Sequence, residues 1–180
     1  MDKKVDTKNN SPLGDGGKTL LIVRHAKSSW EFGIADFDRP LNDRGKKNAP
    51  EMAQRLLDKK ITIDAFVSSP AKRAKQTAEL FCTTYNSNPG EIIFIESLYH
   101  APAMEFFKVI ENLDNKFSSV AIFSHNTGLT NFVNRLVDTI VIDDVPTCGV
   151  FAVTIPIDDW KDFGDTKKEL LFFDYPKNNL

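Results

Sequence analysis

The chain has 180 residues and carries 23 Lys and Arg against 25 Asp and Glu, so its formal net charge is −2. Hydrophobic residues make up 41% and charged residues 27%, close to the averages of soluble globular domains. This composition excludes a disordered chain, a collagen-like repeat and a disulfide-stapled miniprotein. Without a positive net charge, a general binder of nucleic acid is excluded as well. The length is that of one domain with a sizeable core.

The first 17 residues are polar and rich in Asn and Gly, and they predict a disordered N-terminal tail. They lack the apolar centre of a signal peptide, and no apolar run reaches the about 18 residues that a membrane span needs. We therefore expect residues 18–180 to form one folded domain of a cytoplasmic protein that binds no membrane. The end of the tail, Gly17-Lys18-Thr19, is similar to the end of a P-loop, but that motif needs a glycine where Pro12 stands and a preceding strand, so we reject it.

In chain order, residues 19–23 come first as a short apolar run, typical of a strand buried on both faces. Further apolar runs predict strands over 63–68, 92–95, 120–123, 150–155 and 169–173. Amphipathic spacing predicts helices between them, over 42–58, 70–85, 102–113 and 129–137. Because strands alternate with helices, we expect an α/β fold: a single three-layer domain with a mostly parallel sheet of about six strands and helices on both faces.

Prolines bear on where two of these helices begin. Pro50 leaves two alternatives for the helix over 42–58: it kinks at Pro50, or its regular part begins near Asn48, where Asn48 and Glu51 form a capping box. In the next helix, Ser69 is a favourable N-cap and Pro70 a favourable first residue.

The two cysteines, Cys82 and Cys148, lie in apolar patterns, and the chain has neither a C-x-x-C motif nor a Cys/His cluster. A disulfide framework and a structural zinc site are therefore improbable, and we expect two buried thiols and no metal site.

Basic side chains follow three of the predicted strands where each strand ends. Arg24 and His25 follow the first strand, Arg73 lies in the first turn after the second, and His125 follows the fourth. In a parallel sheet, ligands bind beyond the carboxyl ends of the strands, so we expect these four side chains to meet there. Two helix N-termini point at the same edge. Everything at this edge suits a phosphate dianion.

The chemistry of these side chains indicates phosphoryl transfer. Two arginines supply planar pairs of donors for phosphate oxygens. One imidazole can act as a nucleophile that carries the phosphoryl group, and a second can stabilise its equatorial oxygens. Such a reaction needs positioning and electrostatics more than a metal, so we expect no metal and no cofactor.

Three motifs resemble those of the histidine phosphatase superfamily, in the family's order and over nearly the whole chain after the tail. They are Leu21–Ala26, with Ala26 in place of the usual Gly, Ser68–Ala78 and Phe123–Leu129. Within the superfamily, Arg39–Gly45 and Leu98–Ala101 are similar to the small SixA-type branch, whose named member removes phosphate from phosphohistidine on proteins.

The resemblance implies a phosphoglycerate mutase-like fold, a nucleophilic His25, and a phosphate pocket of Arg24, Arg73 and His125. It leaves the acid that protonates the leaving group open. The superfamily commonly places Glu where this chain has His100, and a second branch uses Asp where this chain has Asn126. A phosphoramidate substrate, whose nitrogen leaving group arrives already protonated, fits this absence.

Other residues near these motifs are further candidates. We expect Asn126, Lys27 and His100 to contribute to substrate binding, although Asn126 also suits a helix cap and His100 a structural role. Several more belong to the loops at the predicted edge. Arg39 and Arg44 line the entrance or are solvated, Asp36 and Asp38 are turn residues with a less favoured role in proton transfer, and Trp30 and Phe32 form a wall or anchor their loop.

The sequence therefore predicts a metal-independent phosphatase with a phosphohistidine intermediate. Its substrate is expected to be a phosphorylated small molecule or a phosphohistidine-bearing protein. A phosphoglycerate-mutase-like phosphotransferase is the nearest alternative, and it would carry a longer insertion and a Glu at the position of His100. A non-catalytic sensor of a phosphorylated ligand on the same fold is the other.

Overall fold

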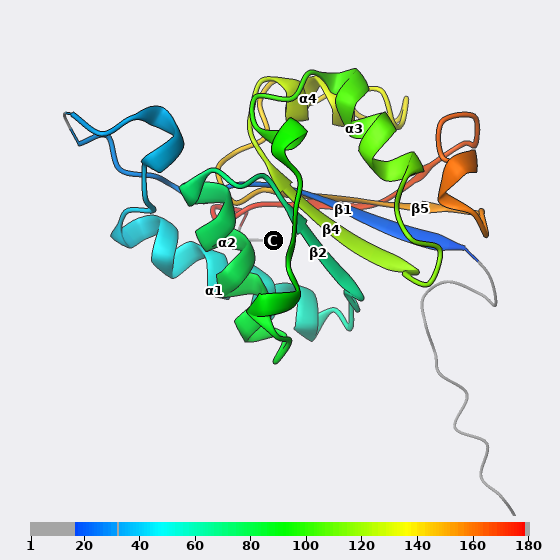
Figure 1. Ribbon diagram of the computed structural model, residues 1–180. Coiled ribbons are helices and arrows are strands. Elements are labelled where there is room, and N and C mark those ends of the chain that lie inside the picture. The colour runs from blue at the N-terminus through cyan, green and yellow to red at the C-terminus, as the bar shows by residue number, and fades with distance from the viewer. Residues whose placement is uncertain (1–16, 32, 179–180) are drawn as a thin grey trace, which may run out of the picture.

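A twisted sheet runs through the middle of the molecule in the computed structural model, which describes residues 17–31 and 33–178 (Figure 1). The predicted tail, apart from Gly17, and Phe32 lie outside the described residues. The strands of this sheet are β1 (Lys18–Arg24), β2 (Ala65–Ser68), β3 (Ile93–Phe94), β4 (Ser119–Ser124), β5 (Val150–Ile155) and β6 (Glu169–Asp174). Their order across the sheet is β3-β2-β4-β1-β5-β6.

The four strands β1 to β4 are parallel, whereas β5 pairs antiparallel with both β1 and β6. Arg24, the last residue of β1, lies opposite Ser124, the last residue of β4. Ser68, the last residue of β2, lies opposite Phe123. The three strand ends that carry the predicted site therefore lie at one edge of the sheet.

Helices cover both faces of this sheet (Figure 1). On one face lie α1 (Asp43–Asp58) and α2 (Lys72–Thr84), and on the other α3 (Ala103–Glu111) and α4 (Gly128–Val133). Because neighbouring side chains of a strand point to opposite faces, Leu20 and Ile22 pack in the core with α3 and α4, while Leu21 and Val23 pack with α1 and α2. The predicted α/β class, with its mostly parallel sheet of six strands, is confirmed.

The helix α1 begins after Asn42, earlier than the start near Asn48 that one of the two alternatives predicted. The Asn42 side chain accepts a hydrogen bond from Gly45 N at 2.9 Å and caps α1, which then continues through Pro50. The capping box at Asn48 is therefore wrong. Proline has no N–H to donate to the carbonyl of Lys46, but Lys46 is exposed, and water can satisfy that carbonyl.

The second helix begins later than predicted. Its N-cap is Ala71, so Ser69 is not the cap and Pro70 precedes the helix. The Ser69 hydroxyl lies 2.8 Å from His125 Nε2 and accepts a weaker hydrogen bond of 3.3 Å from Ala71 N. The main partner of the Ser69 side chain is therefore His125, at the carboxyl ends of the strands, and not the backbone of the helix.

Other predicted elements are shorter in the structure as well: β2 lacks residues 63 and 64, α3 lacks 102, 112 and 113, and β3 and α4 are also shortened. The strand β3 keeps two residues, and both are exposed at the edge of the sheet. The helix α4 ends at Val133, although Leu136 and Val137 beyond it are buried as predicted. The Asn134 side chain explains the end of α4, because it donates to Ile142 O and accepts from Ile142 N, which holds the following loop against the helix end.

Both cysteines are free and buried, as predicted. Burial raises the pKa of the Cys148 thiol well above its usual range, so this thiol is inert. No helix in the described part of the chain has the length and apolar character that crossing a membrane requires.

The start of α4 packs directly against the loop that carries His100. A Cβ atom on Gly128 would collide with the backbone carbonyl oxygen of Ala101. Glycine at this position therefore allows the close approach that brings the loop beside His125.

We predict that Gly128→Ala lowers the free energy of unfolding by about 1–3 kcal/mol, because the added methyl group forces two backbone segments apart. Urea unfolding measures the change. Gly164→Ala is the matched control, since its Cβ would meet only the end of the Glu111 side chain, at 2.6 Å, which can move away. Equal losses in the two variants would contradict the prediction.

Candidate active site

His25 directly follows β1 and is fixed at both ring nitrogens. Its Nδ1 lies 2.7 Å from Ala26 O, and its Nε2 accepts a hydrogen bond of 3.2 Å from Arg73 Nε. A carbonyl oxygen only accepts, so Nδ1 carries the proton and Nε2 carries a lone pair. Thr77 Oγ1 accepts from Ala26 N at 2.9 Å and holds the backbone of this turn.

The surroundings of His25 keep its ring neutral. Burial is the main cause that lowers its pKa to about 3, and the positive charges of Arg73 and Arg24 add to it. At neutral pH, Nε2 is therefore unprotonated, as a nucleophile requires.

His125 lies beside His25, with 5.2 Å between the ring centroids. Its Nε2 is 2.8 Å from Ser69 Oγ, which also accepts from Ala71 N. When the Ser69 hydroxyl donates to Nε2, its single donor is used, and the ring proton then resides on His125 Nδ1. Burial, followed by the neighbouring His25 and Arg73, lowers the pKa of His125 to about 2. The ring is thus a neutral N–H donor.

Arg24 reaches the same place from the last position of β1. Its Nη1 donates to Asp144 Oδ2 at 2.9 Å and to Val145 O at 2.6 Å, so the loop before β5 anchors it. Among the buried side-chain nitrogen and oxygen atoms of the described residues, Arg24 Nε and His125 Nδ1 have no hydrogen-bond partner. Two such atoms at one edge of the sheet suit an anion with several acceptor oxygens.

Arg73, from the first turn of α2, is the most enclosed of the two predicted arginines. Its Nε donates to His25, while Nη1 and Nη2 donate to Asp36 O and to Asp36 Oδ2, the latter at 3.0 Å. The Nε–Nη2 edge is the one that holds a phosphate in a two-point contact. In this structure that edge spans His25 Nε2 and the Asp36 carboxylate.

Asp36 is the acidic residue of the site. Its Oδ2 also accepts from Tyr99 at 2.8 Å and lies 3.2 Å from His100 Nε2, while Oδ1 accepts from Arg39 Nη1 at 2.9 Å. Desolvation opposes its ionisation, but the hydrogen bonds, led by that of Tyr99, outweigh it and hold the pKa of this carboxyl well below its usual range. Asp36 is an anion at every working pH.

The remaining predicted residues lie in different settings. Asn126 donates to Asp144 Oδ1 at 2.6 Å and accepts from Thr130, so its side chain holds the loop that anchors Arg24. Neither of the predicted side-chain roles, the helix cap or the phosphate contact, is observed for Asn126, and the phosphate contact stays a prediction. Lys27 contributes its backbone carbonyl to Asn42 N, and no side-chain hydrogen bond of Lys27 occurs among the described residues.

Arg39 differs from the expectation of a solvated side chain, because it is buried and all three of its guanidinium nitrogens donate. Its guanidinium also stacks on the exposed Trp30 ring, 3.3 Å from the centroid. Trp30 and Arg39 therefore fix the loop that carries Asp36, whereas Arg44 and Asp38 are exposed.

Sequence reasoning missed Asp144 and Tyr99, and it favoured a turn role for Asp36. No local pattern distinguishes these residues, since each acts on a partner from a distant segment. The Ser69-Pro70 pair after β2 is a recognisable sequence feature, but it predicts a helix cap and not the contact between Ser69 and His125.

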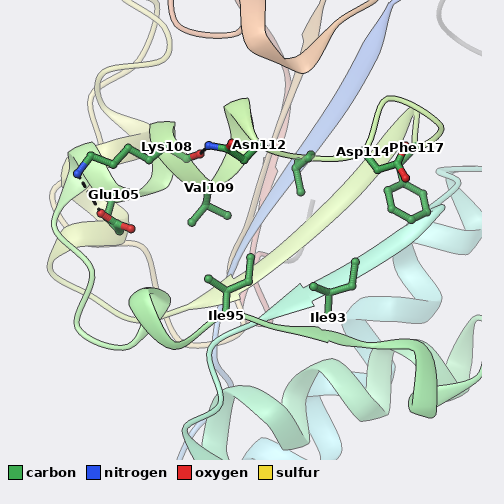
Figure 2. A pocket seen from close by; sticks show the side chains of 9 residues that line it. Ile93, Ile95, Glu105, Lys108, Val109, Asn112, Asp114 and Phe117 are labelled. Carbon is green, nitrogen blue, oxygen red and sulfur yellow. Dashed lines mark hydrogen bonds and ion pairs between the residues drawn. The ribbon is translucent and has the colours of Figure 1, made fainter.

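A separate cavity of about 450 Å³ lies between β3 and α3 (Figure 2). Its wall is mostly apolar, with Ile93, Ile95 and Val109, and its rim carries the ion pair of Lys108 and Glu105 at 3.5 Å. None of the predicted site residues lines it. Within the described ranges, no group of three His, Cys, Asp or Glu is arranged to hold a metal ion.

Two arginines and two neutral imidazoles lie together at the carboxyl ends of the parallel strands, an arrangement of donors that suits an oxyanion. Residues 20–98 match the family model of the histidine phosphatase superfamily (branch 1). The matched segment makes up less than half of the chain, and over it the chain is similar to this superfamily.

The chain is also similar to curated proteins over part of its length. The chain is 28% identical over 127 residues to a chloroplastic protein of Arabidopsis thaliana, a match that covers 66% of this chain and 58% of the relative. It is 42% identical over 64 residues to phosphoserine phosphatase 1 of Hydrogenobacter thermophilus, covering 33% of this chain and 28% of that one. The chain spans less than two thirds of the length of the curated relatives that it matches in Arabidopsis thaliana and Mycobacterium tuberculosis.

A solved structure of the protein histidine phosphatase SixA complexed with tungstate superposes with a TM-score of 0.75. It is 23% identical and is matched over 89% of this chain and 98% of that chain. This similarity shows the fold, and the predicted phosphoglycerate mutase-like fold is confirmed.

The two buried histidines predict a loss of stability in mild acid. Unfolded histidine has a pKa of about 6.5, whereas those of His25 and His125 are lowered to about 3 and about 2. Below pH 6.5 the unfolded chain takes up protons that the folded chain refuses. Stability is therefore full above this pH and falls as the pH falls toward 4, by about 2 kcal/mol per histidine between pH 7 and 5.

Urea unfolding at pH 7, 6 and 5 measures this loss. Carboxyl groups contribute little in this window because their unfolded pKa values lie near 4. The variant His125→Gln should lose about half of the pH dependence. A free energy of unfolding that stays constant from pH 7 to 5 would show that the histidines are not buried in the neutral form.

The contact between the Ser69 hydroxyl and His125 predicts that replacing Ser69 weakens anion binding more than replacing the adjacent Ser68. Ser69→Ala removes the donor that places the proton on His125 Nδ1, so we expect tungstate to bind about 10-fold more weakly, as for the loss of one hydrogen bond. Ser68→Ala is the matched control, because the Ser68 hydroxyl donates to Ser69 O and not to a histidine. Isothermal titration calorimetry measures both affinities, and equal weakening in the two variants would count against the tautomer.

Proposed function

We propose that this protein is a metal-independent phosphatase that works through a phosphohistidine intermediate on His25. One observation carries the proposal: His25 Nε2 holds a lone pair at neutral pH and lies directly beside Arg73, whose guanidinium has the planar donors that suit a phosphate. A neutral imidazole nitrogen that faces a guanidinium is a nucleophile positioned against the anion that it attacks.

The reaction has two steps. In the first, His25 Nε2 forms a bond to phosphorus while the bond from phosphorus to the leaving group breaks. Arg24, Arg73 and the Nδ1–H of His125 donate to the equatorial oxygens, where charge is spread in the transition state. In the second, water attacks the phosphorus, and inorganic phosphate leaves with His25 restored.

The hydrogen bond from His25 Nδ1 to Ala26 O supports both steps. Phosphorylation at Nε2 makes the ring cationic, and a carbonyl oxygen 2.7 Å from Nδ1 stabilises that charge. It also prevents the ring from turning its other nitrogen toward the substrate.

For the substrate, we propose a phosphorylated small molecule or a phosphohistidine on a protein. The similarity to phosphoserine phosphatase 1 supports the first, and the fold shared with SixA supports the second. The described part of the segment between β1 and α1 contains one turn of 3-10 helix, Asp36–Asp38. The side chains of His100 and Asp36 at this edge are 61% and 42% exposed, which supports access for a phosphate carried on a large molecule.

A panel of phosphoserine, sugar phosphates, phosphorylated nucleotides and a phosphohistidine protein, assayed for phosphate release with a chelator present, tests the proposal. The variant His25→Asn keeps a side-chain N–H near Ala26 O but has no nucleophilic nitrogen. We expect it to lose at least about 1,000-fold in kcat. Wild-type protein quenched during turnover should carry one phosphoryl group on His25, detected by mass spectrometry at neutral pH.

Circular dichroism and urea unfolding of the variant provide the control for folding. Full activity of His25→Asn, or loss of wild-type activity with the chelator, would overturn the assignment. Tight phosphate binding without release from any substrate would favour a sensor. Formation of an isomeric phosphate ester instead of free phosphate would favour a phosphotransferase.

A further inference from the structure

His100 lies at the mouth of the active site in an unusual backbone conformation. Its ring is nearly parallel to that of His125, at 11° and with 6.1 Å between the centroids, and Tyr99 packs edge-on against it at 4.2 Å. Its φ of +53° lies in the left-handed region, which residues other than glycine seldom adopt. The packing of Gly128 on Ala101 holds the loop in this place, so the strained residue is built into the fold.

A carboxylate orients the His100 ring. Asp36 Oδ2 lies 3.2 Å from His100 Nε2, and the same carboxylate receives hydrogen bonds from Tyr99, Arg73 and Arg39. These partners hold the carboxylate in one position and keep it ionised, so Asp36 accepts from His100 rather than giving up a proton itself. It also balances the positive charge of the ring when the ring is protonated.

The other acidic residue near the site is engaged by two donors. Asp144 receives Arg24 Nη1 at 2.9 Å and Asn126 Nδ2 at 2.6 Å. The imidazoles of His25 and His125 are neutral, as shown above. Within the described residues, His100 Nδ1 makes no hydrogen bond, and 61% of the side chain is exposed, so this nitrogen is accessible to a substrate. Tyr99, the other polar ring that packs against His125, donates its hydroxyl to Asp36, which leaves His100 Nδ1 as the unpartnered group of this pair.

We propose that His100, oriented by Asp36, is the acid that protonates the leaving group; this inference rests on the proposed phosphatase function. As the bond from His25 Nε2 to phosphorus forms and the bond from phosphorus to the leaving oxygen breaks, the proton moves from His100 Nδ1 to that oxygen. The Nε2–H group of His100 keeps its hydrogen bond to Asp36 throughout. In the second step, the neutral ring takes a proton from the attacking water, which restores the imidazolium.

The proposal assigns the substrate a leaving group that needs a proton, such as the alkoxide of a phosphorylated alcohol. A general acid accelerates such reactions by about 100-fold to 10,000-fold. A leaving group that is stable as an anion, such as p-nitrophenolate, gains little. The dependence of the rate on the leaving group therefore separates an acid from a residue that only supports the pocket.

The experiment compares wild type with His100→Asn on phosphoserine and on p-nitrophenyl phosphate. Asparagine tolerates the left-handed conformation, so the loop is retained. We expect kcat on phosphoserine to fall by about 100-fold or more, while kcat on p-nitrophenyl phosphate stays near the wild-type value. Equal losses on both substrates, or no loss on phosphoserine, would overturn the role of His100 and leave the phosphatase assignment intact. Absence of wild-type turnover on every substrate would instead overturn both.

Tyr99→Phe is the matched control, because Tyr99 donates to the same oxygen of Asp36 as His100 does. A small loss that is equal on both substrates is expected for it. A second readout is the pH profile of kcat/KM on phosphoserine, which should fall on the alkaline side in wild type and lose this ionisation in His100→Asn. The charged and titratable groups that face His100 are Asp36, Tyr99 and His125, with Arg73 and Arg39 behind Asp36. A wild-type profile without an alkaline limb, or one that the variant shares, would also overturn the role.

Discussion

The parallel register between β1 and β4 is the constraint on which the site depends. It sets Arg24 opposite Ser124, so the residues that follow, His25 and His125, leave the sheet side by side. A shift by one residue would turn every side chain of a strand to the other face and separate the two rings. The strands are held in this register by two cores, one on each face, which alternate along β1. Packing of the whole domain therefore determines the distance between two imidazoles.

Within that frame, the charge of the site is distributed by function. Two imidazoles are kept neutral by burial and by the guanidinium groups beside them, which leaves a lone pair on His25 Nε2 and a donor on His125. The two carboxylates, Asp36 and Asp144, hold Arg73 and Arg24 from the outer side. The positive charge that a phosphate needs is thus concentrated in one place of a protein whose formal net charge is −2.

The order of strands and helices followed from periodicity, because buried strands and amphipathic helices differ in the spacing of their apolar residues. Helix ends were less predictable. Asn42 and Asn48 are equally good caps by residue type, and only packing selects Asn42 as the start of α1. Ser69 has the properties of a cap, yet it lies next to His125, a partner 56 residues away, and α2 begins after it. In each case, a tertiary contact decided between local conformations of similar energy.

By itself, the sequence determined which residues stand at the strand ends: Arg24, His25, Arg73 and His125 are adjacent to strands whose ends a parallel sheet must gather at one edge. Only the tertiary structure decided the state of these groups. The proton on His25 Nδ1, the buried neutrality of both rings and the contacts of Asp36, Asp144 and His100 depend on loops that meet in space. Arg24 and Asp144 are 120 residues apart, and Asp36 and His100 are 64 apart. No local pattern encodes such pairs, since hydrogen bonds and desolvation act over a few ångströms in the folded chain, whatever the separation in sequence.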